Sequence, residues 1–329
     1  MKRNMINLAM AFLFGTSLAV TGQGALAAET FPDRPIRLVI PFPPGGAGDI
    51  IGRILSPKLS DELGKPILVD NRGGGNQLIA SQFVAKSAPD GYNLLLASAT
   101  HAINPALVKN LPYDTIKDFS TISLVAEAPT IIVAHPNLGV RTIQELIAMA
   151  KSKPGAINFA SSGMGTAGHL GIEMLKSMAG IDLVHVPYKG AGQAMTDVIS
   201  GKVPVICTSL LAAMPQVRAG AVRALGITGA TRTNVAQGVP TVAEQGLPGF
   251  YSTSWYAVVG PANLSRAVVD RLYTATLRTV KSPDISSQLL NMGAAQPAGL
   301  NPEETLKFVQ AEIARWSEVI KKAGIKAEE

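Results

Sequence analysis

Four times in this chain, an apolar run typical of a β-strand ends in a glycine-rich turn, and a helical pattern follows that turn. The four turns lie at residues 41–49, 71–76, 161–166 and 188–192. Such alternation is typical of α/β folds, in which parallel strands carry their turns at the carboxyl edge of a sheet. A glycine turn before a helix also exposes backbone N–H groups at the positive end of the helix dipole. The sequence therefore predicts an α/β protein whose turns can hold anions.

The apolar pattern continues as two α/β units followed by a C-terminal segment. Strands are expected at 36–40, 67–69, 94–97, 130–134, 157–160, 183–186, 203–206, 224–227 and 255–259. The last two helical patterns, at 265–280 and 302–323, bring little sheet with them, so we expect this segment to return to the first unit. The expected domains are 29–128 with 251–329, and 129–250, each with a parallel-rich sheet flanked by helices.

Residues 1–28 have the pattern of a secretory signal peptide. A basic start precedes an apolar run at 8–20, which is too short to span a membrane, and a small-residue cleavage site follows it. We therefore expect cleavage near Ala27 or Ala28 and a mature protein in the periplasm.

The charge of the chain is mild. The formal net charge is +6, of which the expected signal peptide contributes two, and aromatic residues make up 5% of the chain. The basic residues are scattered along the sequence and form no cluster. Nucleic-acid binding is therefore not expected, although a weak positive field would help small anions to approach.

The motifs of several enzyme classes are missing. The sequence contains no G-x-S-x-G, H-E-x-x-H or C-x-x-C motif, and neither glycine-rich turn of the first unit has a nucleotide fingerprint. The single cysteine, Cys207, fits a small buried residue. His169 and Glu173 are spaced to share a helix face, but a metal site needs further ligands that the pattern does not supply. We expect no catalytic residue, no metal and no cofactor.

Hydroxyl groups surround the third glycine turn. Three of them, on Ser161, Ser162 and Thr166, exceed what one helix N-terminus needs as caps. A carboxylate accepts up to about four hydrogen bonds, so we favour Ser162 and Thr166 as ligand contacts. Tyr188 follows a strand and has two open interpretations, because it could close over a ligand or pack at the sheet edge.

Charged residues near the first two turns also have open interpretations. Asp49 begins the first helix, and we expect it to cap the helix or to orient the glycine turn. Arg72 could pair with a carboxylate ligand or with the nearby Asp70. Trp255 and Tyr256 could line the cleft or belong to the core.

These motifs together resemble a known family, the solute-binding proteins of tripartite tricarboxylate transporters, also called the Bug or TctC family of extracytoplasmic receptors. The matching segments are 41–46 with Asp49 and Arg53, 71–72, 90–92, 111–114, 118–119, 161–166 with His169, 186–190, 239–244, 246–249 and 255–256. They occur in order over nearly all of the chain after the expected signal peptide.

The resemblance implies a two-domain periplasmic binding protein of the clamshell kind. It would capture a small carboxylate and deliver it to a membrane permease with one large and one small subunit, and we expect it to be a monomer. The family's carboxylate-binding roles fall here on Phe42, Pro44, Gly45, Gly46, Ser162, Gly163, Gly165, Thr166 and His169, with Ser98 and Thr100 as further candidates.

One departure from the family concerns the ligand. Many members carry an aspartate after the strand near Val205, where it could bind an ammonium group. Here residues 206–209 carry no acid, which favours a plain mono- or dicarboxylate, aliphatic or aromatic, over an amino acid. Two alternatives stay open at this point: a ligand sensor for a signalling partner, and an exported enzyme acting on small organic acids.

Overall fold

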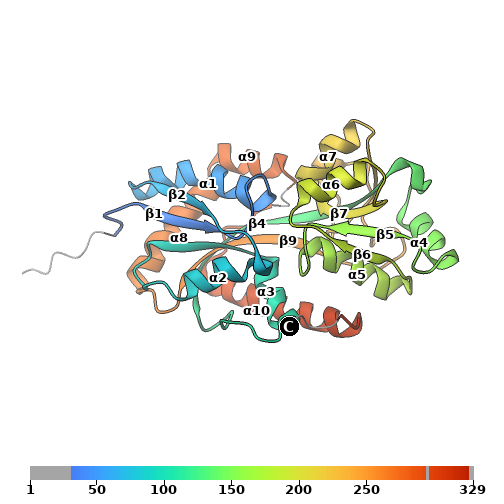
Figure 1. Cartoon of the computed structure of the whole chain (residues 1–329). Helices are drawn as coiled ribbons and strands as arrows, with labels where there is room; N and C mark the ends of the chain where they lie inside the picture. Colours follow the sequence, from blue (N-terminus) through green and yellow to red (C-terminus); the bar gives the residue numbers. More distant parts are fainter. Residues whose placement is uncertain (1–30, 294–295, 326–329) are drawn as a thin grey trace, which may run out of the picture. The chain divides into compact units, whose positions relative to one another are not determined.

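The computed structural model describes residues 31–293 and 296–325, which belong to one compact unit (Figure 1). The expected signal peptide, 1–28, lies outside the described residues. The strands are β1 (Ile36–Ile40), β2 (Ile67–Asn71), β3 (Asn93–Ser98), β4 (Phe119–Ala134), β5 (Asn158–Ser161), β6 (Val184–Pro187), β7 (Val205–Ser209), β8 (Arg223–Ile227), β9 (Thr253–Pro261) and β10 (Gln296–Pro297). The helices are α1 (Ala47–Leu63), α2 (Leu78–Ala85), α3 (Ala99–Leu107), α4 (Ile143–Ser152), α5 (Ala167–Ala179), α6 (Ala191–Ile199), α7 (Leu210–Arg218), α8 (Arg266–Lys281), α9 (Pro283–Asn291) and α10 (Pro302–Lys322). Short 3-10 turns lie at Gly75–Gln77, Pro136–Leu138 and Asn234–Ala236.

The strands form one mixed sheet in the order β2-β1-β3-β9-β4-β7-β5-β6, with β8 and β10 also paired to β4. The outer strands pair in parallel, β1 with β2 and β3, and β5 with β6 and β7. The long central strands β4 and β9 pair antiparallel with each other and with their other neighbours. In Figure 1 these two strands run through the middle of the molecule, between the helices α1, α2 and α8 and the helices α4 to α7.

Strand β4 joins the two groups of outer strands. Its residues 119–129 pair with β9, whereas 130–134 pair with β7 and β8. The sequence predicts a separate strand at 130–134, but this segment is the end of a strand that begins at Phe119. Glu127 and Pro129 interrupt the apolar pattern, and the antiparallel pairing with β9 nevertheless continues through both positions. The expected domain boundary after residue 128 therefore falls within a strand.

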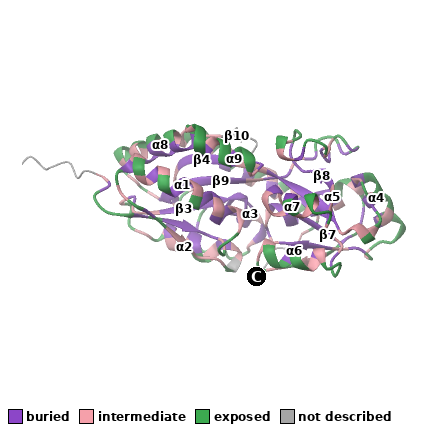
Figure 2. Ribbon diagram, turned by 90° about the horizontal axis from the view of Figure 1, so that it is seen from above, coloured by how far each residue is buried: buried purple, intermediate pink, exposed green. Residues whose placement is uncertain are grey.

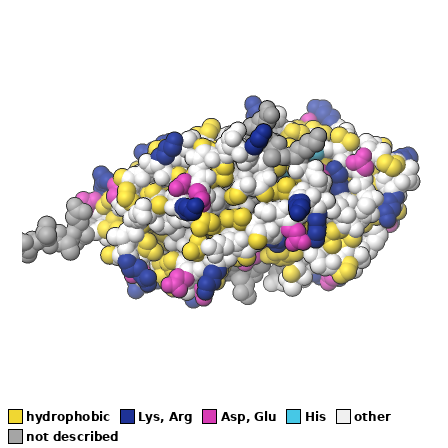
Figure 3. Space-filling view, turned by 90° about the horizontal axis from the view of Figure 1, so that it is seen from below, with side chains coloured by type: hydrophobic (Ala, Val, Ile, Leu, Met, Phe, Trp, Pro, Cys, Tyr) yellow, Lys and Arg dark blue, Asp and Glu magenta, His cyan; other side chains and the backbone are white. Residues whose placement is uncertain are grey.

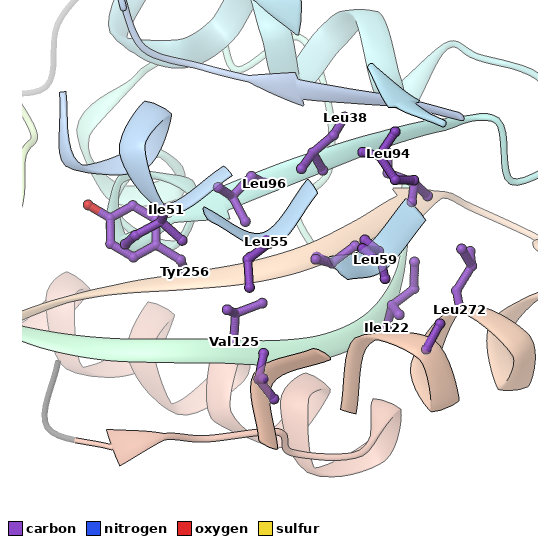
Figure 4. Close-up of a cluster of buried hydrophobic side chains, with 14 of the residues drawn as sticks. Leu38, Ile51, Leu55, Leu59, Leu94, Leu96, Ile122, Val125, Tyr256 and Leu272 are labelled. Carbon is purple, nitrogen blue, oxygen red and sulfur yellow. The ribbon is translucent and has the colours of Figure 1, made fainter. Parts of the chain in front are cut away.

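Alternation along the strands places helices on both faces of the sheet. In β1, Ile36, Leu38 and Ile40 lie in a buried cluster with α1, α8 and α9, whereas Val39 lies in a second cluster with α2, α3 and α10. Figure 4 shows side chains of β1, β3, β4, α1 and α8 gathered in the first cluster.

The other group of strands is covered in the same way. Cys207 of β7 packs with α4 and α5, and its neighbour Ile206 packs with α6 and α7. Figure 2 shows the result, with buried strands inside and helices whose outward faces are exposed. No helix in the described ranges is both long and apolar enough to cross a membrane.

Candidate functional site

Three of the four glycine turns meet at a cavity of about 440 Å³. The first turn contributes residues 42–48, the third contributes Ser162 and residues 166–168, and the fourth contributes residues 189–193. Hydroxyl-bearing and other side chains complete the lining: Ser98, Ala99, Thr100, Thr130, Cys207, Thr208, Ser209, Ser254 and Tyr256. The turns follow β1, β5 and β6, so the cavity lies at the carboxyl ends of these parallel strands, as predicted.

Among the described residues, five helices begin at this cavity: α1, α3, α5, α6 and α7. The first turn of a helix has N–H groups without an intrahelical partner. Thr166 and Ser209 each accept one of these hydrogen bonds, at α5 and α7. At α1, α3 and α6 no side chain caps the helix. The cavity is thus bordered by several helix N-termini with N–H donors available to an anion.

The first turn is held by a buried carboxylate. The Gly45 N–H donates to Asp49 Oδ2 over 2.9 Å, and Asp49 Oδ1 accepts from Arg53 Nε (3.0 Å) and Asn71 Nδ2 (2.9 Å). Burial by itself would raise the pKa of Asp49, but these hydrogen bonds and the charge of Arg53 outweigh it and lower the pKa below its ordinary value. Asp49 therefore orients the glycine turn, which is one of its two expected roles.

The third turn is held by a neutral imidazole. The Gly165 N–H donates to His169 Nδ1 (3.2 Å), and the His169 ring stacks on His185 with 4.1 Å between the ring centroids. Burial, then the nearby His185 and Lys176, lower the pKa of His169 to about 3. The ring is therefore neutral at physiological pH, as its role as an acceptor requires. It lies behind the turn and does not line the cavity.

The hydroxyl of Thr166 is already engaged within its turn. It donates to the Gly163 carbonyl oxygen (2.8 Å) and accepts from the His169 N–H (3.3 Å). Although Thr166 lines the cavity, its hydroxyl has no second proton to donate to a ligand. The Ser162 hydroxyl also borders the cavity and makes no hydrogen bond to any other described residue. Ser162 is therefore the better donor of the two.

The structure places the twelve predicted contact residues in three groups. Those lining the cavity are Phe42, Pro44, Gly45, Gly46, Ser98, Thr100, Ser162 and Thr166. Gly163 and Tyr188 line an adjoining, more open cleft, and the Tyr188 hydroxyl donates to Asp197 Oδ2 (2.8 Å). Gly165 and His169 line neither space. The Ser98 and Thr100 hydroxyls donate within the protein, to Gln77 Oε1 (2.9 Å) and the Gly165 carbonyl oxygen (3.2 Å).

The remaining open interpretations are resolved by contacts. Arg72 donates to Asp70 (2.9 Å) and its guanidinium lies over the Phe83 ring, 3.7 Å from the centroid, so it has a structural role. Trp255 is fully buried, whereas Tyr256 lines the cavity. Burial raises the pKa of Cys207 to about 12, which makes its thiol a poor nucleophile. Within the described part of the chain, no three His, Cys, Asp or Glu residues are placed to hold a metal.

Sequence reasoning missed the lining residues of the fourth turn. Lys189 carries the one charged side chain among the described residues that line the cavity, and Gln193 lies beside it. The sequence carries a signal for the fourth turn, since helices α1, α5 and α6 all begin with an Ala-Gly pair, at 47–48, 167–168 and 191–192. The repeated pair marks the three helices as equivalent, whereas Tyr188 is the one residue of the fourth turn that the sequence predicts as a contact.

Comparisons with known proteins show the family to which this sequence and fold belong. The family described as the tripartite tricarboxylate transporter family receptor matches residues 51–325. Protein BugT of Bordetella pertussis is 34% identical over 317 residues, which are 95% of this chain and 97% of that protein. The solved structure of R. palustris Rpa4515 with adipate is 33% identical, has a TM-score of 0.86, and covers 91% of this chain and 100% of its own. MatC from Rhodopseudomonas palustris with bound malate is 31% identical, has a TM-score of 0.82, and covers 88% and 100%.

Proposed function

This chain belongs to the tripartite tricarboxylate transporter family of solute-binding receptors, as its motifs predict, and we propose that it captures a small carboxylate in the periplasm. It then delivers this ligand to a membrane permease with one large and one small subunit. The observation that carries the proposal is the meeting of five helix N-termini at one cavity, three of them without a side-chain cap. Each N-terminus supplies about half a positive charge, so two to four of them balance one or two carboxylate groups.

The ligand class follows from what lines the cavity. Its described lining carries one cation, Lys189, no carboxylate, and several hydroxyls, including Thr208 and Ser209. An ammonium group would find no anionic partner there, so amino acids bind less well than plain carboxylates. Adipate and malate, the ligands of the two solved relatives, are both dicarboxylates. We propose a mono- or dicarboxylate without an ammonium group.

Capture requires closure of two domains. The first turn follows β1, which is joined through β3 and β9 to residues 119–129 of β4. The third and fourth turns follow β5 and β6, which are joined through β7 to residues 130–134 of β4. We propose that 29–128 with 251–329 and the segment 129–250 close on each other about β4 and β9. A ligand that touches turns from both domains favours the closed state.

The residues that line the described cavity include no side chain suited to acid–base or nucleophilic catalysis. His169 lies behind its turn and is neutral, and the Cys207 thiol is protonated at physiological pH. The basic side chains on the face shown in Figure 3 lie apart, among acidic and uncharged residues, which fits a receptor for small solutes better than one for nucleic acid. We propose that the protein releases its ligand unchanged.

A charge placed in the cavity tests this function. Gly192 is the second residue of α6 and lines the cavity, and a Cβ there would meet nothing within 4 Å. In Gly192→Asp the new carboxylate would occupy an anion site at a helix N-terminus, where it also favours the helix. The control is Ala267→Asp, which adds a carboxylate at the exposed second residue of α8, away from the cavity.

The measurement is thermal shift and calorimetry with adipate, malate, benzoate, aspartate and sulfate. At a ligand concentration of 1,000 Kd, a ligand specific for the folded state adds about 4 kcal/mol of stability. We expect a plain carboxylate to stabilise the wild type and Ala267→Asp, and Gly192→Asp to lose at least about 100-fold in affinity while folding normally. Aspartate outranking every plain carboxylate, or equal affinities for the two variants, would contradict the proposal.

A further inference from the structure

The second glycine turn, residues 71–76, lines the adjoining cleft but not the ligand cavity, although it is as rich in glycine as the other turns. Its residues instead contact both the first and the third turn. We propose that the second turn is a positioning element, which holds the first and third turns at a set distance across the cavity. This inference rests on the proposed function, because the two turns it connects are the proposed carboxylate contacts.

The contact with the first turn is made by Asn71 and Gly73. The Asn71 side chain donates to the Phe42 carbonyl oxygen (3.1 Å) and to Asp49 Oδ1 (2.9 Å). Gly73 lies against Pro43 so closely that a Cβ would come within 3.0 Å of the Pro43 nitrogen and 2.9 Å of its Cδ. The absence of a side chain at residue 73 therefore lets the two turns touch through their backbones.

The contact with the third turn is made by Asn76. A Cβ on Gly165 would lie 2.9 Å from Asn76 Nδ2 and 2.6 Å from Leu107 Cδ2. The Thr100 hydroxyl also donates to the Gly165 carbonyl oxygen over 3.2 Å. Gly165 is therefore the point at which the third turn docks on the second turn and α3, and this contact explains why it is absent from the cavity lining.

Asn76 is itself held by a buried amide. Asn76 Nδ2 donates to Asn104 Oδ1 (3.0 Å), and Asn104 Nδ2 donates to the Asn76 carbonyl oxygen (3.1 Å) and to the Tyr113 hydroxyl oxygen (3.2 Å). Asn104 is fully buried. The backbone of Asn76 has a φ of 50°, a left-handed conformation that asparagine tolerates better than most residues. A buried amide with satisfied partners is costly to displace, so the Asn76 side chain has a fixed position against which the third turn packs.

The consequence is a link between two binding turns that come from opposite ends of the sheet. The first turn follows β1 and the third follows β5, and four strands, β3, β9, β4 and β7, lie between these two in the sheet order. The second turn adds to the connections that β4, β9 and the α3 contacts of Gly165 already make. With it, the third turn has a contact with the first domain, through Asn76, that does not involve the ligand.

The first test needs no ligand. Hydrogen exchange of the backbone amides at 163–169 is measured in the ligand-free protein for the wild type, Asn76→Gly and Asn263→Gly. Asn76→Gly removes the side chain that contacts Gly165 but keeps a residue that adopts positive φ. Asn263 is an exposed asparagine with a φ of 64°, outside all the turns, so Asn263→Gly is the matched control. We expect at least tenfold faster exchange in Asn76→Gly alone, and equal exchange in the two variants would overturn the inference.

The second test measures adipate affinity by calorimetry. Gly165→Ala places a methyl group against Asn76 and Leu107, whereas Gly180→Ala, at the other end of α5, has nearly the same φ (62° against 60°) and nothing within 4 Å of the new Cβ. We expect Gly165→Ala to lose at least tenfold more affinity than Gly180→Ala, and an equal loss would contradict the positioning role. If the wild type binds no carboxylate, the proposed function fails, and the exchange experiment still decides the positioning role.

Discussion

In the first glycine turn, the Gly45 N–H donates to the side chain of Asp49, and in the third turn the Gly165 N–H donates to His169, again four residues later. Both acceptors are the third residue of a helix that opens with Ala-Gly. The geometry of the two turns is therefore shared, while the acceptor is an anion in one and a neutral ring in the other.

The surroundings explain how each acceptor is stable. Asp49 has Arg53 and Asn71 as donors, so its charge is compensated beside the cavity. His169 stacks on His185, with the Phe159 ring 6.3 Å away, in a buried place where a charge would be poorly solvated. The comparison teaches that the turn requires an acceptor at this position, and that the acceptor's charge is set by the side chains packed around it.

The largest expected difference between the two turns lies in their Ala-Gly pairs. A Cβ on Gly168 would lie 2.3 Å from the Cys207 carbonyl oxygen, whereas a Cβ on Gly48 would lie 2.6 Å from the Phe42 ring. Backbone cannot move aside as a ring can, so we expect Gly168→Ala to cost about 3 kcal/mol of unfolding free energy and Gly48→Ala about 1 kcal/mol. Urea unfolding of both variants measures this. Equal costs would mean that β7 yields as readily as the Phe42 side chain.

The next difference is in the response to pH. The pKa of His169 is about 3 in the folded protein, below its ordinary 6.5, so the unfolded chain takes up the proton first as pH falls. The contribution of neutral His169 to the free energy of unfolding is complete above about pH 6.5 and declines towards pH 3. By pH 5, about 2 kcal/mol of this contribution is lost. The pKa of Asp49 is lowered from 3.8, so its contribution is lost only below that pH. Acid therefore weakens the third turn before the first.

The variant His169→Gln tests this order. Glutamine keeps an oxygen acceptor for the Gly165 N–H but does not titrate, and the contributions of His101 and His185 remain in both proteins. We expect the unfolding free energy of the variant, measured in urea at pH 6.5 and pH 5, to fall by about 2 kcal/mol less than that of the wild type. Parallel pH dependences would show that His169 is solvated enough to titrate normally.

The parts of the fold that were predictable from sequence are those set by local pattern. Helix α1 follows the apolar spacing of Ile51, Leu55 and Leu59, and it ends at Gly64, which has a φ of 73°. The continuity of β4 was not predictable, because Glu127 and Pro129 break its pattern and only pairing with the distant β9 makes the strand continuous. Helix α9 was missed despite a start signal in the sequence, Ser282 followed by Pro283.

The site shows the same division. The glycine turns were found because glycine, hydroxyl and helical spacing are local signals. The role of His169 was not predictable, since the sequence places it in the helix but cannot tell that its ring stacks on His185 of β6 or that its Nδ1 accepts from the Gly165 N–H. Similarly, Gly165 packs against Asn76 and Leu107, which lie far away in sequence, whereas a Cβ on Gly45 would meet nothing within 4 Å.

The smallest expected effect concerns the fourth turn, which extends the comparison to a third helix. Gln193 is the third residue of α6, the place of Asp49 and His169, but in the described structure it accepts no hydrogen bond from a turn N–H. It is exposed and lines the cavity, so its amide can meet the ligand directly. We expect Gln193→Ala to weaken adipate binding about fivefold, or about 1 kcal/mol, and to leave the melting temperature of the ligand-free protein unchanged. Gln288→Ala, at an exposed glutamine of α9, is the control for calorimetry. A lower melting temperature without a change in affinity would instead give Gln193 the same role as Asp49 and His169, with all three residues supporting their turns.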